Sequence, residues 1–157
     1  MPTYHANLVN DVKTLVCSEP HWLASLANVS ALLFERMPDI SWAGFYLLKN
    51  KKLILGPFQG RVACVSIDIG KGVCGTAFQE QKTIVVPDVH KFPGHIACDI
   101  RSNSEIVIPL IKNKRTLGVL DIDSTSYSRF TEEDRKMLES VASIVTEYCN
   151  LEDFVDC

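Results

Sequence analysis

The residues around three closely spaced glycines decide which kind of sheet this chain can form. Gly70, Gly72 and Gly75 have the GxGxxG spacing of a dinucleotide-binding turn, which joins a parallel strand to a helix. Such a strand is buried on both faces and is almost wholly apolar. Residues 61–69, RVACVSIDI, instead alternate, as a strand with one buried face does. We therefore expect an antiparallel sheet, in which the glycines form either a turn whose N–H groups hold an anion or a purely structural turn.

Hydrophobic spacing along the rest of the chain predicts helices at both ends and hairpins between them. Pro20 is expected in the first turn of the second helix, and TEED at 131–134 is a capping box that opens the last one. The expected helices span 4–17, 20–37, 73–80 and 131–148, and the expected strands span 41–49, 52–58, 61–69, 83–87, 105–112 and 115–123. The pattern predicts one α+β domain over residues 1–150, with the terminal helices packed on a mostly antiparallel sheet of about six strands, and a loose acidic tail at 151–157.

Charge and hydropathy exclude several classes of function. The net charge is -3, so the chain carries no basic field for a nucleic acid backbone. No apolar run approaches the length that spans a bilayer, and the first residues lack the basic start and apolar run of a signal peptide. We expect a cytoplasmic protein that binds neither nucleic acid nor membrane and whose thiols are kept reduced.

The aperiodic segment 88–104 is expected to be a long ordered loop, and loops of this length in compact domains are usually functional. Cys98 lies in this segment, with His95 and Asp99 close by. A loop thiol beside polar groups is the arrangement expected of a reactive cysteine.

Cysteines give the strongest chemical signal in the chain. Cys64, Cys74 and Cys98 each lie beside glycine or other small residues. A zinc site that combines them with His90 or His95 is one interpretation, but no CxxC knuckle occurs and the spacings are irregular, so no metal is expected. Thiol redox chemistry fits better, because a peroxidatic cysteine needs a second thiol to resolve its sulfenic acid. No role follows for the remaining cysteines, Cys17, Cys149 and Cys157.

A cluster of carboxylates is expected on one strand face. Asp121 and Asp123 are two residues apart and share a face with Leu117 and Val119. Glu105 joins them across the sheet if the intervening hairpin loop has an odd number of residues, and it points away if the number is even. Three convergent acids raise at least one pKa and create a proton donor at neutral pH. Alternatively, Asp123 caps the following turn and Asp121 pairs with a base.

Trp42, Gly44 and Tyr46 share one face of an expected strand. Aromatic side chains on an alternating strand usually pack in the core, and that is one interpretation of Trp42 and Tyr46. The other is a partial aromatic wall for a small ligand.

Five stretches, ISWAGFYLL, LILGPFQGRVACVSIDIGKGVCGTAF, VVPDVHKFPGHIACD, SEIVIPL and LGVLDIDS, together resemble the GAF-domain free methionine-(R)-sulfoxide reductases. The likeness covers about residues 40–126. It implies a GAF-like, PAS-related fold and the thiol-dependent reduction of free L-methionine (R)-S-oxide to L-methionine, with no cofactor.

The same resemblance implies roles for the three cysteines. Cys98 matches the catalytic cysteine, whose thiolate attacks the sulfoxide sulfur and is left as a sulfenic acid. Cys64 matches the resolving cysteine, which implies a Cys64–Cys98 disulfide, and Cys74 is an alternative partner.

The resemblance also implies a substrate site. Glu105 and Asp123 match family acids, with Asp121 beside them, and each of the three is a candidate to donate a proton or to bind the substrate ammonium. Trp42 and Tyr46 match pocket aromatics, which would hold the methyl group and a partly cationic sulfur.

The implied partners are free methionine sulfoxide and a thioredoxin-type dithiol that restores the thiols. A homodimer is expected, because helices at both ends of a GAF-like domain often pair. The alternative function is a non-enzymatic GAF sensor of a small ligand or of redox state.

Overall fold

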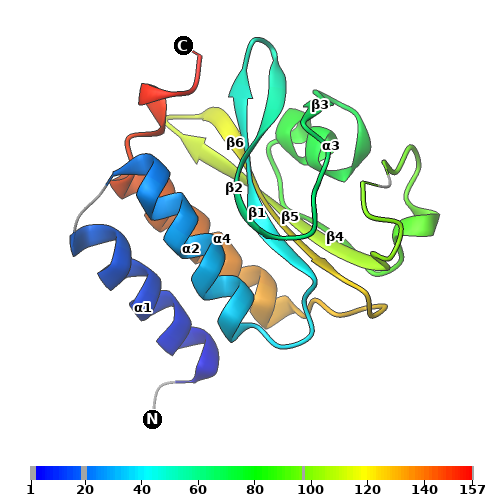
Figure 1. The fold of residues 1–157 in the computed structure, drawn as a ribbon, viewed down its shortest axis with the longest axis horizontal. Helices are drawn as coiled ribbons and strands as arrows, with labels where there is room; N and C mark the ends of the chain where they lie inside the picture. The colour runs from blue at the N-terminus through cyan, green and yellow to red at the C-terminus, as the bar shows by residue number, and fades with distance from the viewer. Residues whose placement is uncertain (1–2, 19–20, 97, 157) are drawn as a thin grey trace.

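The structure is a computed structural model that describes residues 3–18, 21–96 and 98–156, so the expectations for Pro20 and Cys157 lie outside the described residues. Its strands are β1 (Trp42–Lys49), β2 (Lys52–Gly60), β3 (Ser66–Asp68), β4 (Ile84–Val86), β5 (Ser104–Lys112) and β6 (Arg115–Ser124). They form a six-stranded sheet in the order β3-β2-β1-β6-β5-β4, and every neighbouring pair is antiparallel (Figure 1). The predicted α+β class with an antiparallel sheet is confirmed.

Helices α1 (Tyr4–Ser18), α2 (Trp22–Arg36) and α4 (Glu132–Tyr148) cover one face of the sheet (Figure 1). α2 packs on β1 and β2, α4 packs on β5, and α1 lies outside them against both helices. Each fully buried Leu or Val contributes roughly 1.5–3 kcal/mol, so the apolar stripes of these helices make this layer the main core. Those stripes include Leu8, Val12, Val16, Leu26, Val29, Leu33, Leu138, Val141 and Val145. In the parts of the chain that the structure describes, none of the helices combines the length and the apolar character needed to cross a bilayer.

The predicted capping box fixes the start of α4. The Thr131 hydroxyl accepts a hydrogen bond from the Asp134 N–H at 3.1 Å, and the Asp134 carboxylate accepts one from the Thr131 N–H at 2.9 Å. Arg129 donates to the same carboxylate at 2.8 Å, and a ring nitrogen of His5 lies 3.1 Å from it. Asp134 therefore ties α1 and the β6–α4 connection to the helix N-terminus.

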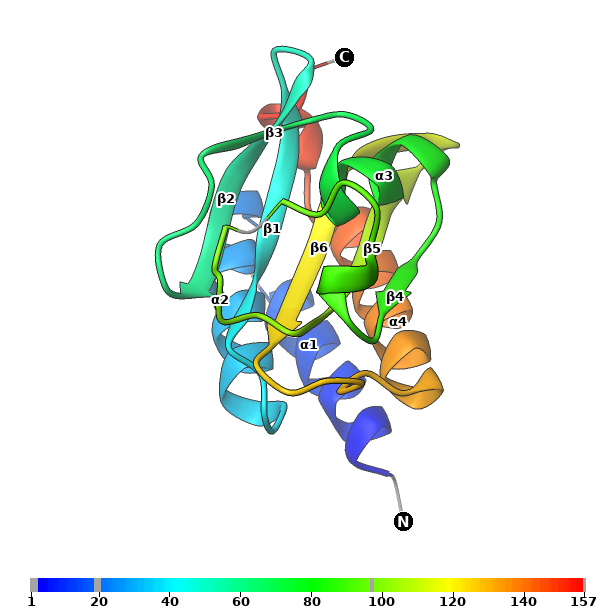
Figure 2. The ribbon, with the colours of Figure 1, turned by 90° about the vertical axis from the view of Figure 1, so that its right-hand side faces the viewer.

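The opposite face of the sheet carries α3 (Gly72–Glu80) and the long connection from β4 to β5 (Figure 2). This connection is the predicted loop, and it contains one short 3-10 helix, η1 (Val89–Lys91). A smaller apolar cluster, which includes Leu53, Ile67, Val73, Ala77, Val107 and Val119, attaches this layer to the sheet. The space beside that cluster is where the polar residues of the site collect.

The three glycines serve a tight turn between β3 and α3. Gly70 and Gly72 have positive φ angles of 84° and 62°, which favour glycine. The Gly75 N–H donates to the Lys71 carbonyl in the first turn of the helix, and a side chain at Gly75 would collide with the Asp68 carbonyl. The strand before the turn belongs to an antiparallel sheet, in agreement with the rejection of a dinucleotide fold.

A β-bulge sets the register of the β5–β6 hairpin. Asn113 and Lys114 form its turn, both with positive φ, as in a two-residue type I′ hairpin. An even loop by itself would point Glu105 away from Asp123. The pairing shifts by one residue beyond the turn, because Leu117 has no partner, and Glu105 then lies opposite Asp123. The bulge thus decides the question that loop length alone left open.

The expectation of a strand over the whole of 61–69 is wrong, because only β3 pairs in the sheet. The residues before β3 leave the sheet and cross to the pocket side. The Trp42 indole donates to the Arg61 carbonyl at 3.1 Å, and the Tyr46 hydroxyl donates to the Cys64 carbonyl at 3.0 Å. These bonds pair the Arg61 and Cys64 carbonyls, which an extended strand would have paired within the sheet.

The expectation of a loose C-terminal tail is also wrong for the residues described. The short 3-10 helix η2 (Leu151–Asp153) follows α4, and Leu151 and Val155 are buried in the main core. Phe154 packs on Trp22 with ring centroids 5.2 Å apart. Apolar side chains within an acidic stretch thus anchor it.

Candidate functional site

A pocket lies between the sheet and the layer formed by α3 and the β4–β5 connection. The sheet contributes its floor, the start of α3 contributes one wall, and the connection covers its mouth. All but one of the sequence-predicted site residues line it: Trp42, Tyr46, Cys74, Cys98, Glu105, Asp121 and Asp123. The exception, Cys64, reaches it through a bond to Cys98. Segments far apart in the sequence therefore meet at one pocket.

Cys64 and Cys98 form a disulfide across the pocket mouth. Their Cα atoms are 5.4 Å apart, although the residues are separated by 34 positions in the chain. Both residues are half-buried, so the bond lies at the surface of the pocket and not in the core. The pairing that the family resemblance implied is present. In this oxidation state a zinc site that combines all three cysteines with a histidine cannot form, because Cys64 and Cys98 are joined to each other.

The three carboxylates converge on the pocket floor from adjacent strands. Glu105 on β5 lies opposite Asp123 on β6, and Asp121 lies two residues before Asp123 on the same face of β6. Glu105 and Asp121 are buried, and Asp123 is half-buried. In the described residues, no lysine or arginine nitrogen lies within 4.0 Å of these carboxylates. The alternative in which Asp121 pairs with a base is therefore wrong.

Burial dominates the electrostatics of this cluster. It raises the pKa of Glu105 well above its ordinary value, and the neighbouring Asp121 raises that pKa further. It likewise raises the pKa of Asp121, with Asp123 adding to the effect, and the pKa of Asp123, with Glu105 adding to it. Because like charges this close repel one another, the protonated form of these carboxyls is favoured over that of a free carboxyl.

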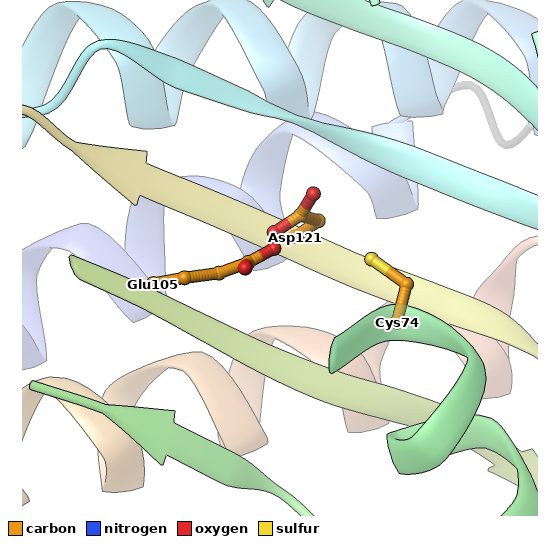
Figure 3. A group of neighbouring side chains, drawn as sticks. All are labelled: Cys74, Glu105 and Asp121. Carbon is orange, nitrogen blue, oxygen red and sulfur yellow. The ribbon is translucent and has the colours of Figure 1, made fainter. Parts of the chain in front are cut away.

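Cys74 lies in the first turn of α3 and points at the carboxylates (Figure 3). It is a free thiol, 4% exposed, and its sulfur lies within 4.8 Å of carboxylate oxygens of Glu105 and Asp121. Burial raises the pKa of Cys74 well above its ordinary value, and Asp121 and Glu105 raise it further. A thiol in this position is a weak nucleophile, because thiolate is the reactive form.

Stacked aromatic rings form the apolar side of the pocket. Trp42 and Tyr46 have ring centroids 6.0 Å apart, and Trp42 also stacks on Phe58 at 5.1 Å. Gly44 lies between the first two on β1, and a side chain there would come within 2.8 Å of the Trp42 ring. Phe58 supports the Trp42 ring from outside the pocket lining and was not among the expected site residues, although its position opposite Gly44 across a predicted hairpin is a signal that identifies it.

His95 was expected beside Cys98, but its approach to Glu105 was not expected. One of its ring nitrogens lies 4.0 Å from Glu105, and burial lowers the pKa of the ring. The other histidine considered as a metal ligand, His90, instead contacts Asp88 at 2.8 Å on an exposed turn. Its ring lies beside Tyr127, outside the pocket lining.

Comparisons with known proteins give a consistent result. Residues 24–147 match the sequence pattern of the GAF domain family. Free methionine-R-sulfoxide reductase of Escherichia coli (strain K12) is 54% identical over 140 residues, which covers 89% of this chain and 85% of that protein.

Two solved structures of similar chains contain substrate. The fRMsr of Staphylococcus aureus in complex with substrate has a TM-score of 0.88 at 49% identity, and the match covers 94% of this chain and 97% of that one. The free methionine-R-sulfoxide reductase of Neisseria meningitidis in complex with its substrate has a TM-score of 0.90 at 40% identity, covering 96% and 90%. The likeness therefore extends over nearly the whole length of each chain.

Proposed function

The chain belongs to the family of GAF-domain free methionine-R-sulfoxide reductases, and from that membership we propose that it reduces free L-methionine (R)-S-oxide to L-methionine with electrons from its own thiols. The observation that carries the proposal for this chain is the Cys64–Cys98 disulfide at the mouth of an acid-lined pocket. That bond is the product expected when a sulfenic acid at one cysteine is resolved by the other.

The first step is oxygen transfer to Cys98. Its thiolate attacks the sulfoxide sulfur while a carboxyl of the Glu105 and Asp123 pair protonates the sulfoxide oxygen, which otherwise leaves poorly. The protonated oxygen then passes from the substrate sulfur to the Cys98 sulfur, and the transient bond between the two sulfurs breaks together with the sulfur–oxygen bond of the substrate. Methionine is released with an electron pair restored to its sulfur, and Cys98 carries the oxygen as a sulfenic acid. The raised pKa values of the acid cluster support this assignment, since a proton donor must be protonated at the working pH.

The second step restores the enzyme. The Cys64 thiol attacks the Cys98 sulfenic acid, which releases water and forms the disulfide. A dithiol protein of the thioredoxin type then reduces this bond by thiol–disulfide exchange, and its own thiols become a disulfide. The half-buried position of both cysteines supports such an exchange, because an external thiol can reach a bond at the pocket mouth.

Substrate recognition follows from the rest of the lining. Asp121 binds the substrate ammonium, and Trp42 and Tyr46 hold the methylthio end against their ring faces. The start of α3 at Gly72 offers free backbone N–H groups beside the pocket, and these bind the substrate carboxylate. Cys74 remains a candidate second resolving thiol, although its burial and raised pKa favour Cys64 in that role.

A coupled assay tests the function. Turnover of NADPH by thioredoxin reductase and thioredoxin is measured with each sulfoxide epimer of free methionine, and with a peptide that contains methionine sulfoxide. We expect activity with the free R epimer alone. Binding of this epimer without turnover would instead make the chain a sensor and overturn the proposal.

We further propose that the chain works as a homodimer in the reducing cytoplasm. Leu23 and Phe34 on α2 are exposed, and their apolar surface supports pairing of the helical layer. Light scattering after size exclusion tests the dimer, and a single-chain mass would contradict it. A disulfide that must be reduced in every cycle supports a compartment with a thiol reductant.

A further inference from the structure

One ligand-bearing side chain in the pocket, Cys74, is not required by the reaction proposed above, where it is only a candidate second resolving thiol. Cys74 comes from α3, Glu105 from β5 and Asp121 from β6, and the three point toward a common centre (Figure 3). Their sulfur and carboxylate oxygens all lie within 4.8 Å of one another. The reaction uses Cys98 and Cys64, so the presence of a third thiol among buried acids calls for its own explanation.

An unpaired oxygen points to a missing cation. The Oδ1 atom of Asp121 is buried and has no hydrogen-bond partner among the described residues, and Asp121 itself is 6% exposed. Leaving a buried carboxylate oxygen unpaired costs free energy, which a positively charged ligand would recover. Among the lysine, arginine and histidine side chains of the described residues, His95 is the one that comes within 4.0 Å of a carboxylate of the cluster, and it does so at Glu105.

We propose that Cys74, Glu105 and Asp121 form a binding site for a thiophilic divalent cation, with zinc as its biological member. Thiolate sulfur selects zinc and similar ions over magnesium and calcium, which prefer all-oxygen ligands. Zinc bonds sulfur at about 2.3 Å and carboxylate oxygen at about 2.1 Å, so its ligand atoms are about 3.5 Å apart. Binding would draw the ligand atoms, which lie within 4.8 Å of one another, closer together, and the metal displaces the thiol proton as it binds. Asp123 or a water molecule fills the fourth position.

The site makes metal and substrate mutually exclusive. This consequence rests on the proposed function, in which Asp121 binds the substrate ammonium and Glu105 serves the sulfoxide oxygen. A zinc ion bound to the carboxylate oxygens of Asp121 and Glu105 blocks their contacts with the substrate ammonium and the sulfoxide oxygen. Zinc therefore competes with methionine sulfoxide. Because Cys74 stays outside the Cys64–Cys98 bond, the site persists when the enzyme is in its disulfide form.

The disulfide form provides a clean test, because Cys64 and Cys98 cannot act as ligands in it. Cys17 and Cys157 are replaced by serine in the background protein, which is then titrated with Co²⁺. We expect about one equivalent to bind with a thiolate-to-cobalt charge-transfer band. The Cys74→Ser variant should lose the band and bind Zn²⁺ at least tenfold more weakly, whereas the matched Cys149→Ser variant should keep both. A band that survives Cys74→Ser would overturn the proposal.

A measurement on the unaltered chain keeps the proposal testable if a variant does not fold. The X-ray absorption spectrum of the zinc-loaded disulfide form should show one sulfur among otherwise oxygen neighbours. Two or more sulfurs, or none, would contradict the site. L-methionine (R)-S-oxide should raise the apparent Kd for Co²⁺, and an unchanged Kd would overturn the mutual exclusion. The spectra do not depend on turnover, so a metal-binding protein without reductase activity would refute the proposed function and leave the metal site standing.

Discussion

Glu105 of β5 lies directly opposite Asp123 of β6, and the bulge at Leu117 is what places it there. Side chains alternate between the two faces of a sheet. A shift of one residue in the pairing register therefore moves every side chain of a strand to the opposite face. Without the bulge, Glu105 would point into the helical layer, where an unpaired carboxylate has no partner. The bulge therefore assembles the acid cluster and also keeps a charge out of the main core.

The two disulfide cysteines should differ in single-turnover behaviour. Cys98→Ser removes the nucleophile and should release no methionine. Cys64→Ser should release about one equivalent per chain and then stop, because the sulfenic acid has no efficient resolving thiol. Methionine is quantified by mass spectrometry without added reductant, and a dimedone adduct at Cys98 marks the trapped sulfenic acid. Repeated turnover by the Cys64→Ser protein would show that Cys74 resolves the intermediate equally well.

Glu105→Gln should lower activity and raise stability together. The change removes a proton donor, so kcat/KM should fall about 100-fold or more. It also removes a carboxyl whose ionised form is disfavoured in the folded state by burial and by the neighbouring acids, so the free energy of unfolding should rise by about 1 kcal/mol or more. Burial raises the pKa of Glu105, so the folded state holds its proton more tightly and wild-type stability declines as pH rises above the ordinary Glu range.

The stabilisation by Glu105→Gln should therefore be larger at alkaline than at acid pH. Thermal unfolding of the variant and the wild type at both pH values checks this sign. Glu35→Gln, at an exposed position, is the matched control, and its effect should stay within about 0.5 kcal/mol. A glutamine variant that loses stability at every pH would contradict the claim that the acids repel one another.

Tyr46→Phe should slow disulfide formation more than oxygen transfer. The ring remains in the pocket, but the hydroxyl no longer donates to the Cys64 carbonyl, a bond of 3.0 Å that holds the resolving cysteine near Cys98. We expect the first methionine to be released at nearly the wild-type rate and the sulfenic acid to persist several times longer, as followed by dimedone trapping. Tyr4→Phe removes a similar surface bond, from a hydroxyl to the Arg36 carbonyl, and should change neither step. Equal slowing of both steps in Tyr46→Phe would argue against a role in placing Cys64.

Asp134→Asn should destabilise the fold without touching the pocket. Although burial alone raises the pKa of Asp134, the Thr131 N–H, His5 and Arg129 together hold it below its ordinary value. A depressed pKa means that the ionised group stabilises the fold above the ordinary Asp pKa of about 3.9, and that this stability is lost as pH falls through the folded-state value. At neutral pH the free energy of unfolding of the variant should be lower than that of the wild type by about 2–4 kcal/mol.

The difference between Asp134→Asn and the wild type should shrink below about pH 4, where the wild-type carboxylate is protonated. Urea denaturation at neutral and acid pH measures it. Asp11→Asn breaks an exposed ion pair with Arg36 and should cost less than about 1 kcal/mol at either pH. A pH-independent difference for Asp134→Asn would show that the cap, and not the charge, provides the stability.

Local patterns predicted most of the elements because their causes are local. The helical spacing of Leu8, Val12 and Val16 and the TEED capping box each depend on residues within a few turns of one another. The resemblance to a known family added the roles, and the structure brings every residue so identified to one pocket.

Long-range contacts account for what the sequence could not predict. Hydrogen bonds from Trp42 and Tyr46 hold the segment before β3 outside the sheet. Burial of Leu151 and Val155 in the main core anchors a C-terminal segment whose composition is acidic. His95 approaches Glu105 through a connection without periodicity, so no spacing in the chain predicts their distance.

The amino-acid sequence by itself determined the antiparallel class and the helix ends, because periodicity and capping act over a few residues, and its resemblance to a known family named the candidate reactive groups. Only the tertiary structure decided which faces those groups share. The bulge at Leu117 sets the register that places Glu105 opposite Asp123. Hydrogen bonds donated by the Trp42 indole and the Tyr46 hydroxyl fix the path of the segment that carries Cys64 to Cys98. Both depend on side chains that meet across the sheet, and such contacts form only once the chain is folded.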